Sequence, residues 1–174
     1  DLKNIFSGSA DRRYGLVKRL IARKEILNIR KGLYCLAEKY RRHELNLFAL
    51  AQRLYGPSYV SLESALSYHG WIPEAVYTVT NVCMKRSKDF HTPLGLFSFK
   101  RIPEHIFYQG VERIQLTPGE AFLIASPLKA VADYMYVYKK NWRGLKPVIG
   151  SLRVEPEMLK TITQDEIEEM RKNY

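Results

Sequence analysis

The chain has 174 residues, of which 46% are hydrophobic and 26% are charged, and its formal net charge at pH 7 is +10. This composition is typical of a folded globular protein and argues against a disordered or low-complexity chain. No apolar run approaches the roughly 18 residues of a membrane-spanning helix, and no signal-peptide pattern is present, so we expect a cytoplasmic protein with no membrane partner.

The excess positive charge is concentrated near the N-terminus. Residues 1–42 contain 12 Lys or Arg and four Asp or Glu, a net charge of +8. The other 132 residues contain 16 basic and 14 acidic side chains, a net charge of +2. This asymmetry predicts two domains, a basic module at residues 1–42 and an almost neutral body at residues 43–174.

The first predicted elements are helical. Residues 2–7 form a short amphipathic segment, which ends at Gly8 and Ser9, a residue that permits a turn and one that can cap a helix. A second helix is predicted over residues 10–24. Its apolar side chains recur on one side at about 100° per residue, which predicts the face that packs on the core. These side chains are Leu16, Val17, Leu20 and Ile21.

A basic stripe lies beside this apolar face. At the same angular step, Arg12, Arg19 and Arg23 fall within about 40° of one another, whereas Lys18 lies further round the helix. The three arginines are therefore expected to point outward together. Gly15 weakens the helix by about 1 kcal/mol relative to alanine, and a close approach of the backbone to some other group is the one reason we find for it.

Two short strips rich in β-forming residues follow, at residues 26–29 and 33–36. A tight turn of Arg30, Lys31 and Gly32 separates them, which predicts a β-hairpin with a basic tip. Helix, turn, longer helix and basic hairpin is the order of elements in a winged helix-turn-helix. Since the chain begins with Asp1 rather than Met, we expect the first helix of that module to lie further upstream. Residues 39–44 then form a charged break.

The body is predicted to be α+β with a mainly antiparallel sheet. Ser61 is expected to cap a helix that reaches His69, with Gly70 in the left-handed conformation just beyond it. Residues 117–120 are expected to form the turn of a hairpin, and Ser126 with Pro127 is expected to start a helix. The predicted helices span residues 45–54, 61–69, 126–140, 155–160 and 164–172, and the predicted strands span residues 76–82, 94–102, 111–116 and 121–125.

Three stretches resemble the AbiEi family of antitoxins from bacterial type IV toxin-antitoxin systems. LVKRLIARKEILNIRKGLYCL is similar to the family's pattern of basic helix, apolar strand, basic turn and G-x-Y. YVSLESALSYHGWIPEAVYTVTNV is similar to the start of the family's C-terminal domain, and SPLKAVADYMY is similar to a later helix of that domain. The resemblance covers residues 9–138, and the second stretch is its most specific part.

This resemblance implies two functions for the chain. An N-terminal winged helix-turn-helix would bind double-stranded DNA at the operator of its own operon and repress it. A C-terminal domain would be needed for antitoxin activity in abortive infection. The toxin of such systems is similar to nucleotidyltransferases, and the antagonism is generally indirect rather than through a tight complex.

The basic side chains of the first module are the candidate binding residues. Arginines on the helix can contact guanine O6 and N7 in the major groove or clamp phosphate. Arg30 and Lys31 at the hairpin tip can reach a minor groove or the flanking phosphates. A solvated helix face and a soluble turn are the alternative explanations. The candidate DNA-binding residues are Arg12, Arg13, Lys18, Arg19, Arg23, Arg30, Lys31, Arg41 and Arg42.

Two other functions are compatible with the sequence. The basic end could instead bind an acidic protein partner or a toxin directly. Alternatively, Glu120 and Asp133, with Lys129 between them, could form a nuclease-like acidic site. Asp133 is more simply explained as a partner for a nearby Lys or Tyr, and Glu120 as a turn residue. Since catalytic loops and paired-carboxylate motifs are missing, we do not expect an enzyme.

Metal and cofactor sites have no signature in the sequence. Cys35 and Cys83 form no C-x-x-C pair, which argues against a zinc site and against a disulfide framework. The four histidines share no spacing of four residues and have no acidic partner at ligand spacing. We therefore expect neither a bound metal nor a cofactor.

Overall fold

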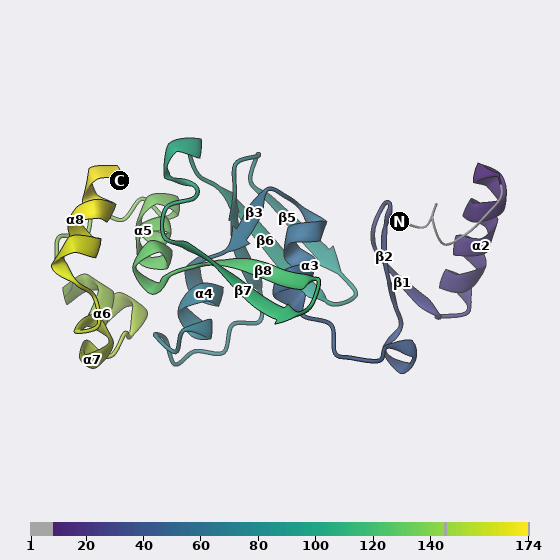
Figure 1. Cartoon of the computed structure of the whole chain (residues 1–174), viewed down its shortest axis with the longest axis horizontal. Coiled ribbons are helices and arrows are strands. Elements are labelled where there is room, and N and C mark those ends of the chain that lie inside the picture. The colour runs from purple at the N-terminus through teal and green to yellow at the C-terminus, as the bar shows by residue number, and fades with distance from the viewer. Residues whose placement is uncertain (1–8, 145, 174) are drawn as a thin grey trace. The chain divides into compact units, whose positions relative to one another are not determined.

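The computed structural model describes residues 9–144 and 146–173 (Figure 1). The amphipathic segment expected at residues 2–7 lies outside the described residues. The chain divides into two compact units. The basic unit comprises the residues up to Leu45 and Thr92–Leu94, and the C-terminal unit comprises Asn46–His91 and the residues from Gly95 onward.

The basic unit is built from a helix and a hairpin. Helix α2 spans Ala10–Ala22 and starts where the Oγ of Ser9 accepts a hydrogen bond from the Arg12 backbone N–H at 3.3 Å. Strands β1 (Ile26–Arg30) and β2 (Leu33–Leu36) pair in antiparallel fashion, and a short 3-10 helix follows at Glu38–Tyr40. The predicted helix and hairpin are confirmed at these positions.

The core of the basic unit is small. Val17 of α2 and Ile26 and Ile29 of β1 are buried, and α2 packs against β1. The expectation that all four apolar residues of α2 form a core face is wrong for Ile21, which is 37% exposed. In the described part of this unit, α2 has a single hairpin beside it. One hairpin covers a narrower strip of the helix surface than the apolar face, about 100° wide, that a fully packed helix buries. A winged helix-turn-helix arrangement stays a prediction.

The C-terminal unit is α+β, as predicted, with a six-stranded, mostly antiparallel sheet in the order β5-β6-β4-β3-β8-β7. Strand β3 pairs with β4, and β7 with β8, in antiparallel fashion, whereas β3 with β8 and β4 with β6 are parallel. The strands are β3 (Ser58–Val60), β4 (Val79–Cys83), β5 (Lys88–Thr92), β6 (Gly95–Arg101), β7 (Val111–Thr117) and β8 (Glu120–Ala125).

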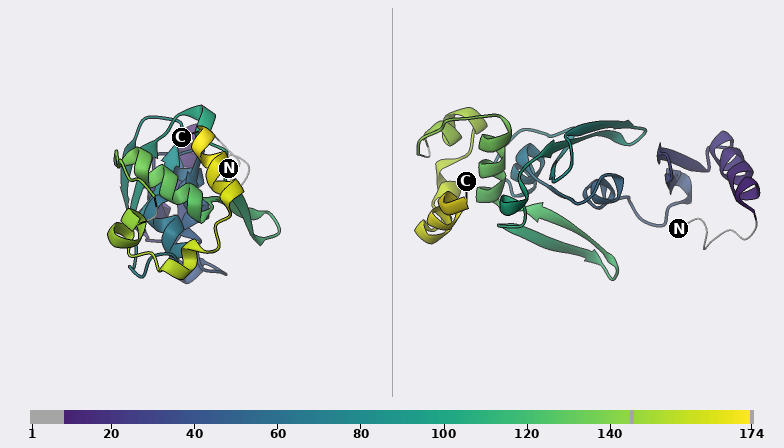
Figure 2. Two further views of the ribbon diagram at one scale, coloured as in Figure 1. Left: turned by 90° about the vertical axis from the view of Figure 1, so that its left-hand side faces the viewer. Right: turned by 90° about the horizontal axis from the view of Figure 1, so that it is seen from above.

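Helices cover this sheet and gather beyond one end of it. Helix α3 packs against β8 and β3, helix α4 packs against α5 and β4, and the helices from α5 to α8 lie together at the C-terminal end of the unit (Figures 1 and 2). No helix among the described residues combines the length and apolar composition needed to cross a membrane. The helices are α3 (Leu47–Leu54), α4 (Leu62–Tyr68), α5 (Pro127–Val137), α6 (Lys146–Leu152), α7 (Pro156–Leu159) and α8 (Gln164–Asn173).

Local signals account for several helix boundaries. Asn46 caps α3, because its Oδ1 accepts from the backbone N–H groups of Phe48 and Ala49 at 2.9 and 3.0 Å. Gly70 has φ +72° just after α4, as predicted. Ser61 does occupy the N-cap position of α4, but the expectation that its side chain caps the helix is wrong, since no such bond is present. Its hydroxyl has a different partner, Asp133.

Four further elements differ from the sequence-based prediction. The strand predicted over residues 76–82 begins only at Val79, because residues 72–78 form a loop. Strands β3 and β5 and helix α6 were not expected. Strand β3 has only three residues, and β5 carries mostly polar side chains, so neither shows the alternation of a half-buried strand.

Candidate functional site

The nine candidate DNA-binding residues all lie in the basic unit. Four of them, Arg12, Arg13, Lys18 and Arg19, are on α2, and Arg23 is the residue that ends this helix. Seven of the nine side chains are exposed, whereas Arg13 and Arg41 are half-buried. The exposed residues are Arg12, Lys18, Arg19, Arg23, Arg30, Lys31 and Arg42.

The helical stripe has the geometry that the spacing predicts. Helix α2 is continuous from Ala10 to Ala22, so a step of about 100° per residue applies to Arg12 and Arg19. Arg23 keeps αR backbone angles, φ −80° and ψ 0°, and therefore extends the same stripe by one residue. The backbone leaves the helix at Lys24, where φ is +55°.

The hairpin tip is a two-residue turn of Lys31 and Gly32. Gly32 has φ +83°, a left-handed conformation that glycine adopts at little cost. Arg30 is the last residue of β1 and pairs with Leu33. Arg30 and Lys31 are both exposed, so the turn presents two adjacent cations to solvent.

Contacts within the basic unit explain why an arginine stands at position 41, whereas the described residues show no such contact for Arg42. The Nε of Arg41 donates to the carbonyl oxygen of Leu36 at 2.8 Å, and its Nη2 lies 3.9 Å from the Sγ of Cys35. Burial raises the pKa of the Cys35 thiol, and the nearby Arg41 charge opposes this shift. Arg41 therefore attaches the segment after the hairpin to β2, which leaves fewer of its N–H groups for a ligand.

In the part of the chain that the structure describes, the exposed cations of the basic unit form no ion pair with an acidic side chain. Among the described residues, the four ion pairs of 4.0 Å or less all lie in the C-terminal unit, and none of them includes one of the seven exposed residues. Uncompensated charges on one small unit create a positive potential that attracts polyanions. This is the electrostatic pattern of a nucleic-acid-binding surface.

Asp133 is confirmed as a partner for a nearby Lys and Tyr. Its Oδ1 lies 2.9 Å from the Nζ of Lys129, and its Oδ2 accepts hydrogen bonds from Tyr59 at 2.9 Å and Ser61 at 2.7 Å. The Asp133 side chain is completely buried. Glu120 is the first residue of β8, next to the turn at residues 118–119, as expected.

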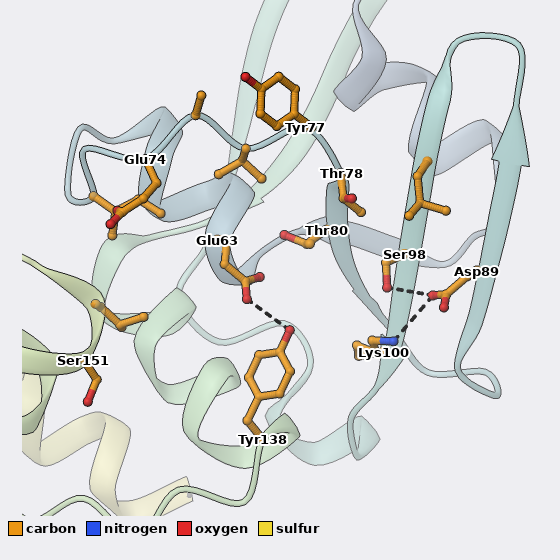
Figure 3. A pocket seen from close by; sticks show the side chains of 15 residues that line it. Glu63, Glu74, Tyr77, Thr78, Thr80, Asp89, Ser98, Lys100, Tyr138 and Ser151 are labelled. Atoms are coloured by element: carbon orange, nitrogen blue, oxygen red, sulfur yellow. Dashed lines mark hydrogen bonds and ion pairs between the residues drawn. The ribbon is translucent and has the colours of Figure 1, made fainter.

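The C-terminal unit contains a pocket of about 590 Å³ that the sequence did not reveal (Figure 3). Its walls come from α4, the loop before β4, the strands β4, β5 and β6, the residue after α5, and the end of α6. These segments extend from Glu63 to Leu152, so no local motif joins them. The sequence contains one indication of the pocket. Ser98 lies between two phenylalanines in β6 and is therefore a polar residue within the buried part of a strand.

Three carboxylates line this pocket, and two of them, those of Glu63 and Asp89, are hydrogen-bonded to other residues that line it (Figure 3). The Oε1 of Glu63 accepts from the hydroxyl of Tyr138 at 3.1 Å, and the Oδ1 of Asp89 accepts from the Oγ of Ser98 at 2.7 Å. The Ser98 hydrogen bond lowers the pKa of Asp89, and the Lys100 ammonium, 3.5 Å away, adds to this effect. Burial raises the pKa of Tyr138, and the charge of Glu63 raises it further.

A scan of protein-family models and a search of curated proteins both returned no match to this chain.

Proposed function

We propose that the protein binds double-stranded DNA through the basic unit. The observation that carries this proposal is the set of seven exposed cations on α2, the hairpin tip and residue 42, which take part in none of the ion pairs among the described residues. DNA carries one negative charge per about 1.7 Å of helix axis. Displacing its counterions would provide most of the binding free energy.

The two parts of the basic unit have different roles in this proposal. The stripe of Arg12, Arg19 and Arg23 lies on a helix, and a helix is the element that fits the major groove and contacts base edges. Arg30 and Lys31 lie on a turn, from which they contact phosphates. The turn therefore supplies affinity for any sequence, and the helix supplies sequence preference.

The biological role that we propose rests on the resemblance to AbiEi antitoxins. In this role the protein binds the operator of its own operon, represses transcription, and acts as the antitoxin of a type IV toxin-antitoxin system in abortive infection. Antagonism of a nucleotidyltransferase-like toxin would be indirect. The basic unit contributes the repressor function, and the C-terminal unit contributes the antitoxin function.

The proposal is tested by fluorescence anisotropy with the full chain and two DNA duplexes. One duplex comes from the region upstream of the protein's own gene, and the other is a shuffled sequence of equal length and composition. Replacing Arg30 and Lys31 by alanine should weaken binding to both duplexes by the same factor. Arg19→Ala should also cost about 1–3 kcal/mol of preference for the upstream duplex.

A matched control removes two charges from the other unit. Lys140 and Arg143 are exposed side chains of the C-terminal unit, and replacing both by alanine changes the net charge as much as the hairpin variant does. The control variant should bind both duplexes almost as tightly as the wild type. If the hairpin variant and the control variant bind equally well, the DNA interface is not where we place it.

A further inference from the structure

The pocket of the C-terminal unit is acidic, although the chain as a whole is strongly basic. Three carboxylates line it, those of Glu63, Glu74 and Asp89, and Lys100 is the only Lys or Arg among the lining residues. The net charge of the chain is +10. A volume of about 590 Å³ lies within the range of ordinary small-ligand sites. The charge of the pocket therefore favours a cationic ligand.

Glu63 is the carboxylate that lacks a cation. Asp89 has Lys100 at 3.5 Å, and Glu74 has Arg153 at 3.1 Å. Among the described residues, no Lys or Arg nitrogen lies within 4.0 Å of Glu63, and its one hydrogen bond comes from the neutral hydroxyl of Tyr138. An added positive charge is thus best placed next to Glu63.

The second carboxylate oxygen of Glu63 also favours a ligand that donates a hydrogen bond. Its Oε2 is buried and has no hydrogen-bond partner in the described part of the chain. Buried polar atoms in native proteins are almost always hydrogen-bonded, so an unpaired carboxylate oxygen beside a cavity indicates a missing donor. Figure 3 shows the Glu63 carboxylate next to Tyr138, among the side chains that line the pocket.

The other walls of the pocket suit an aliphatic stem and further N–H donors. Apolar side chains contribute part of the lining, and methylene groups would pack against them. Asp89 and Ser98 provide additional acceptor oxygens on the sheet side (Figure 3). A guanidinium has five donors in a planar fork, whereas an ammonium is a point charge with three. The aliphatic lining residues are Ile72, Ala75, Val76, Leu96 and Leu152.

We propose that this pocket binds an alkylguanidinium group, with the guanidinium hydrogen-bonded to Glu63 and its aliphatic stem packed on the apolar wall. This inference is independent of DNA binding, because it concerns the C-terminal unit alone. The group comes either from a free small molecule or from an arginine side chain that a peptide presents. Both sources share the same chemistry at Glu63.

The first experiment uses n-propylguanidinium and follows the amide signals of the full chain by NMR. The expected result is a saturable shift of amides around the pocket, such as those of Glu63 and Ser98. The control ligand is n-propylurea, which has the same shape without the charge, and equal ionic strength is kept with sodium chloride. If n-propylurea produces the same shifts at the same concentrations, or if neither ligand produces saturable shifts, the proposal is wrong.

Two conservative variants test the role of the carboxylate. Glu63→Gln removes the charge but keeps an oxygen that accepts from Tyr138, and it should weaken binding of n-propylguanidinium by about tenfold or more. Glu112→Gln removes one charge from an exposed site on β7, outside the pocket. This second variant should bind as the wild type does. Equal affinities of the two variants would overturn the assignment to Glu63.

A second experiment distinguishes the two sources of the group. An acetylated and amidated pentapeptide with one central arginine is compared with the same peptide containing citrulline. Tighter binding of the arginine peptide than of n-propylguanidinium identifies a peptide-borne arginine as the ligand. Equal or weaker binding of the peptide identifies a free small molecule. In either case the citrulline peptide should not bind, and binding of both peptides alike would contradict the proposal.

Discussion

The Nζ of Lys129 lies 2.9 Å from the Oδ1 of Asp133, and both side chains are completely buried. Lys129 also donates to the carbonyl oxygen of Ile106 at 2.7 Å. Burial lowers the pKa of Lys129, and the charge of Asp133 opposes this shift. The pair connects α5 to β3 through Tyr59 and to the segment that precedes β7 through Ile106. It is therefore the polar centre of the C-terminal unit.

Removing one member of this pair should strongly destabilise the C-terminal unit. Lys129→Met would leave the Asp133 charge buried without its cation, which costs about 3–5 kcal/mol. Urea unfolding followed by tryptophan fluorescence measures this unit alone, because both tryptophans of the chain, Trp71 and Trp142, belong to it. The matched control is Lys160→Met, which breaks an exposed pair with Glu157 and should cost about 0–1 kcal/mol. Equal losses in the two variants would contradict this account of the buried pair.

Ser61 should stabilise the protein through its hydrogen bond to Asp133 rather than by capping α4. Ser61→Ala removes a 2.7 Å hydrogen bond to a buried carboxylate, and we expect a loss of about 1–3 kcal/mol in the free energy of unfolding. The Ser61 side chain makes no capping bond, so the start of α4 should keep its protection against amide hydrogen exchange. A small loss of stability together with a frayed α4 would show that Ser61 is a cap after all.

Glu63 should control the ionisation of Tyr138. Burial and the Glu63 charge together hold the pKa of Tyr138 above its ordinary value of 10.0. Neutral Tyr138 therefore contributes to stability below pH 10, and this contribution is lost as the pH rises through the folded-state value. Glu63→Gln removes the charge but leaves the phenol buried, so the pKa should fall only part of the way back.

Ultraviolet absorbance of tyrosinate measures this change. As the pH rises above the ordinary tyrosine pKa of about 10, the Glu63→Gln variant should ionise Tyr138 at a lower pH than the wild type does. Glu112→Gln, which removes an exposed charge from β7, should titrate as the wild type does. Identical titration curves for all three proteins would mean that the Glu63 charge does not act on Tyr138.

Much of the basic unit could be predicted because its signals are local. Ser9 marks the start of α2, and Gly32 sets the turn of the hairpin. Neither signal depends on a distant residue. The exposure of Ile21 could not be predicted, because the helical pattern tells which side is apolar but not how much of it a neighbouring element covers.

The C-terminal unit was less predictable because its important contacts are distant in sequence. The hydroxyl of Ser61 bonds to Asp133, 72 residues away, although its local pattern is that of a cap. Glu63 and Tyr138 are 75 residues apart, so the pocket has no motif. Strand β5 was not recognised because its polar side chains suit an edge strand, where burial does not enforce an apolar pattern.

Replacing Gly15 by alanine should stabilise α2 but weaken DNA binding. A methyl group at Gly15 would meet no atom within 4 Å, so Gly15→Ala should stabilise α2 by about 0.5–1 kcal/mol. Gly15 also lies about 60° from Arg12 on the helix, beside the basic stripe. If that stripe faces DNA, the methyl group keeps the phosphates further away, and we expect weaker DNA binding despite the stabler helix.

Gly150 provides the control for this prediction. It lies in α6 of the C-terminal unit, and a methyl group there would also meet no atom within 4 Å. Gly150→Ala should stabilise its own helix, measured by native-state hydrogen exchange, and should leave DNA binding unchanged. If both alanine variants bind DNA as the wild type does, the Gly15 side of α2 does not contact DNA.

The salt dependence of DNA binding by the full chain tests the central claim most directly. Each phosphate contact contributes about −0.9 to the slope of log affinity against log salt concentration, so about five contacts predict a slope between about −4 and −5. Replacing Arg30 and Lys31 by alanine should make this slope less negative by about 2. A slope near zero for the wild type, or an unchanged slope for the variant, would contradict a DNA interface on the basic unit.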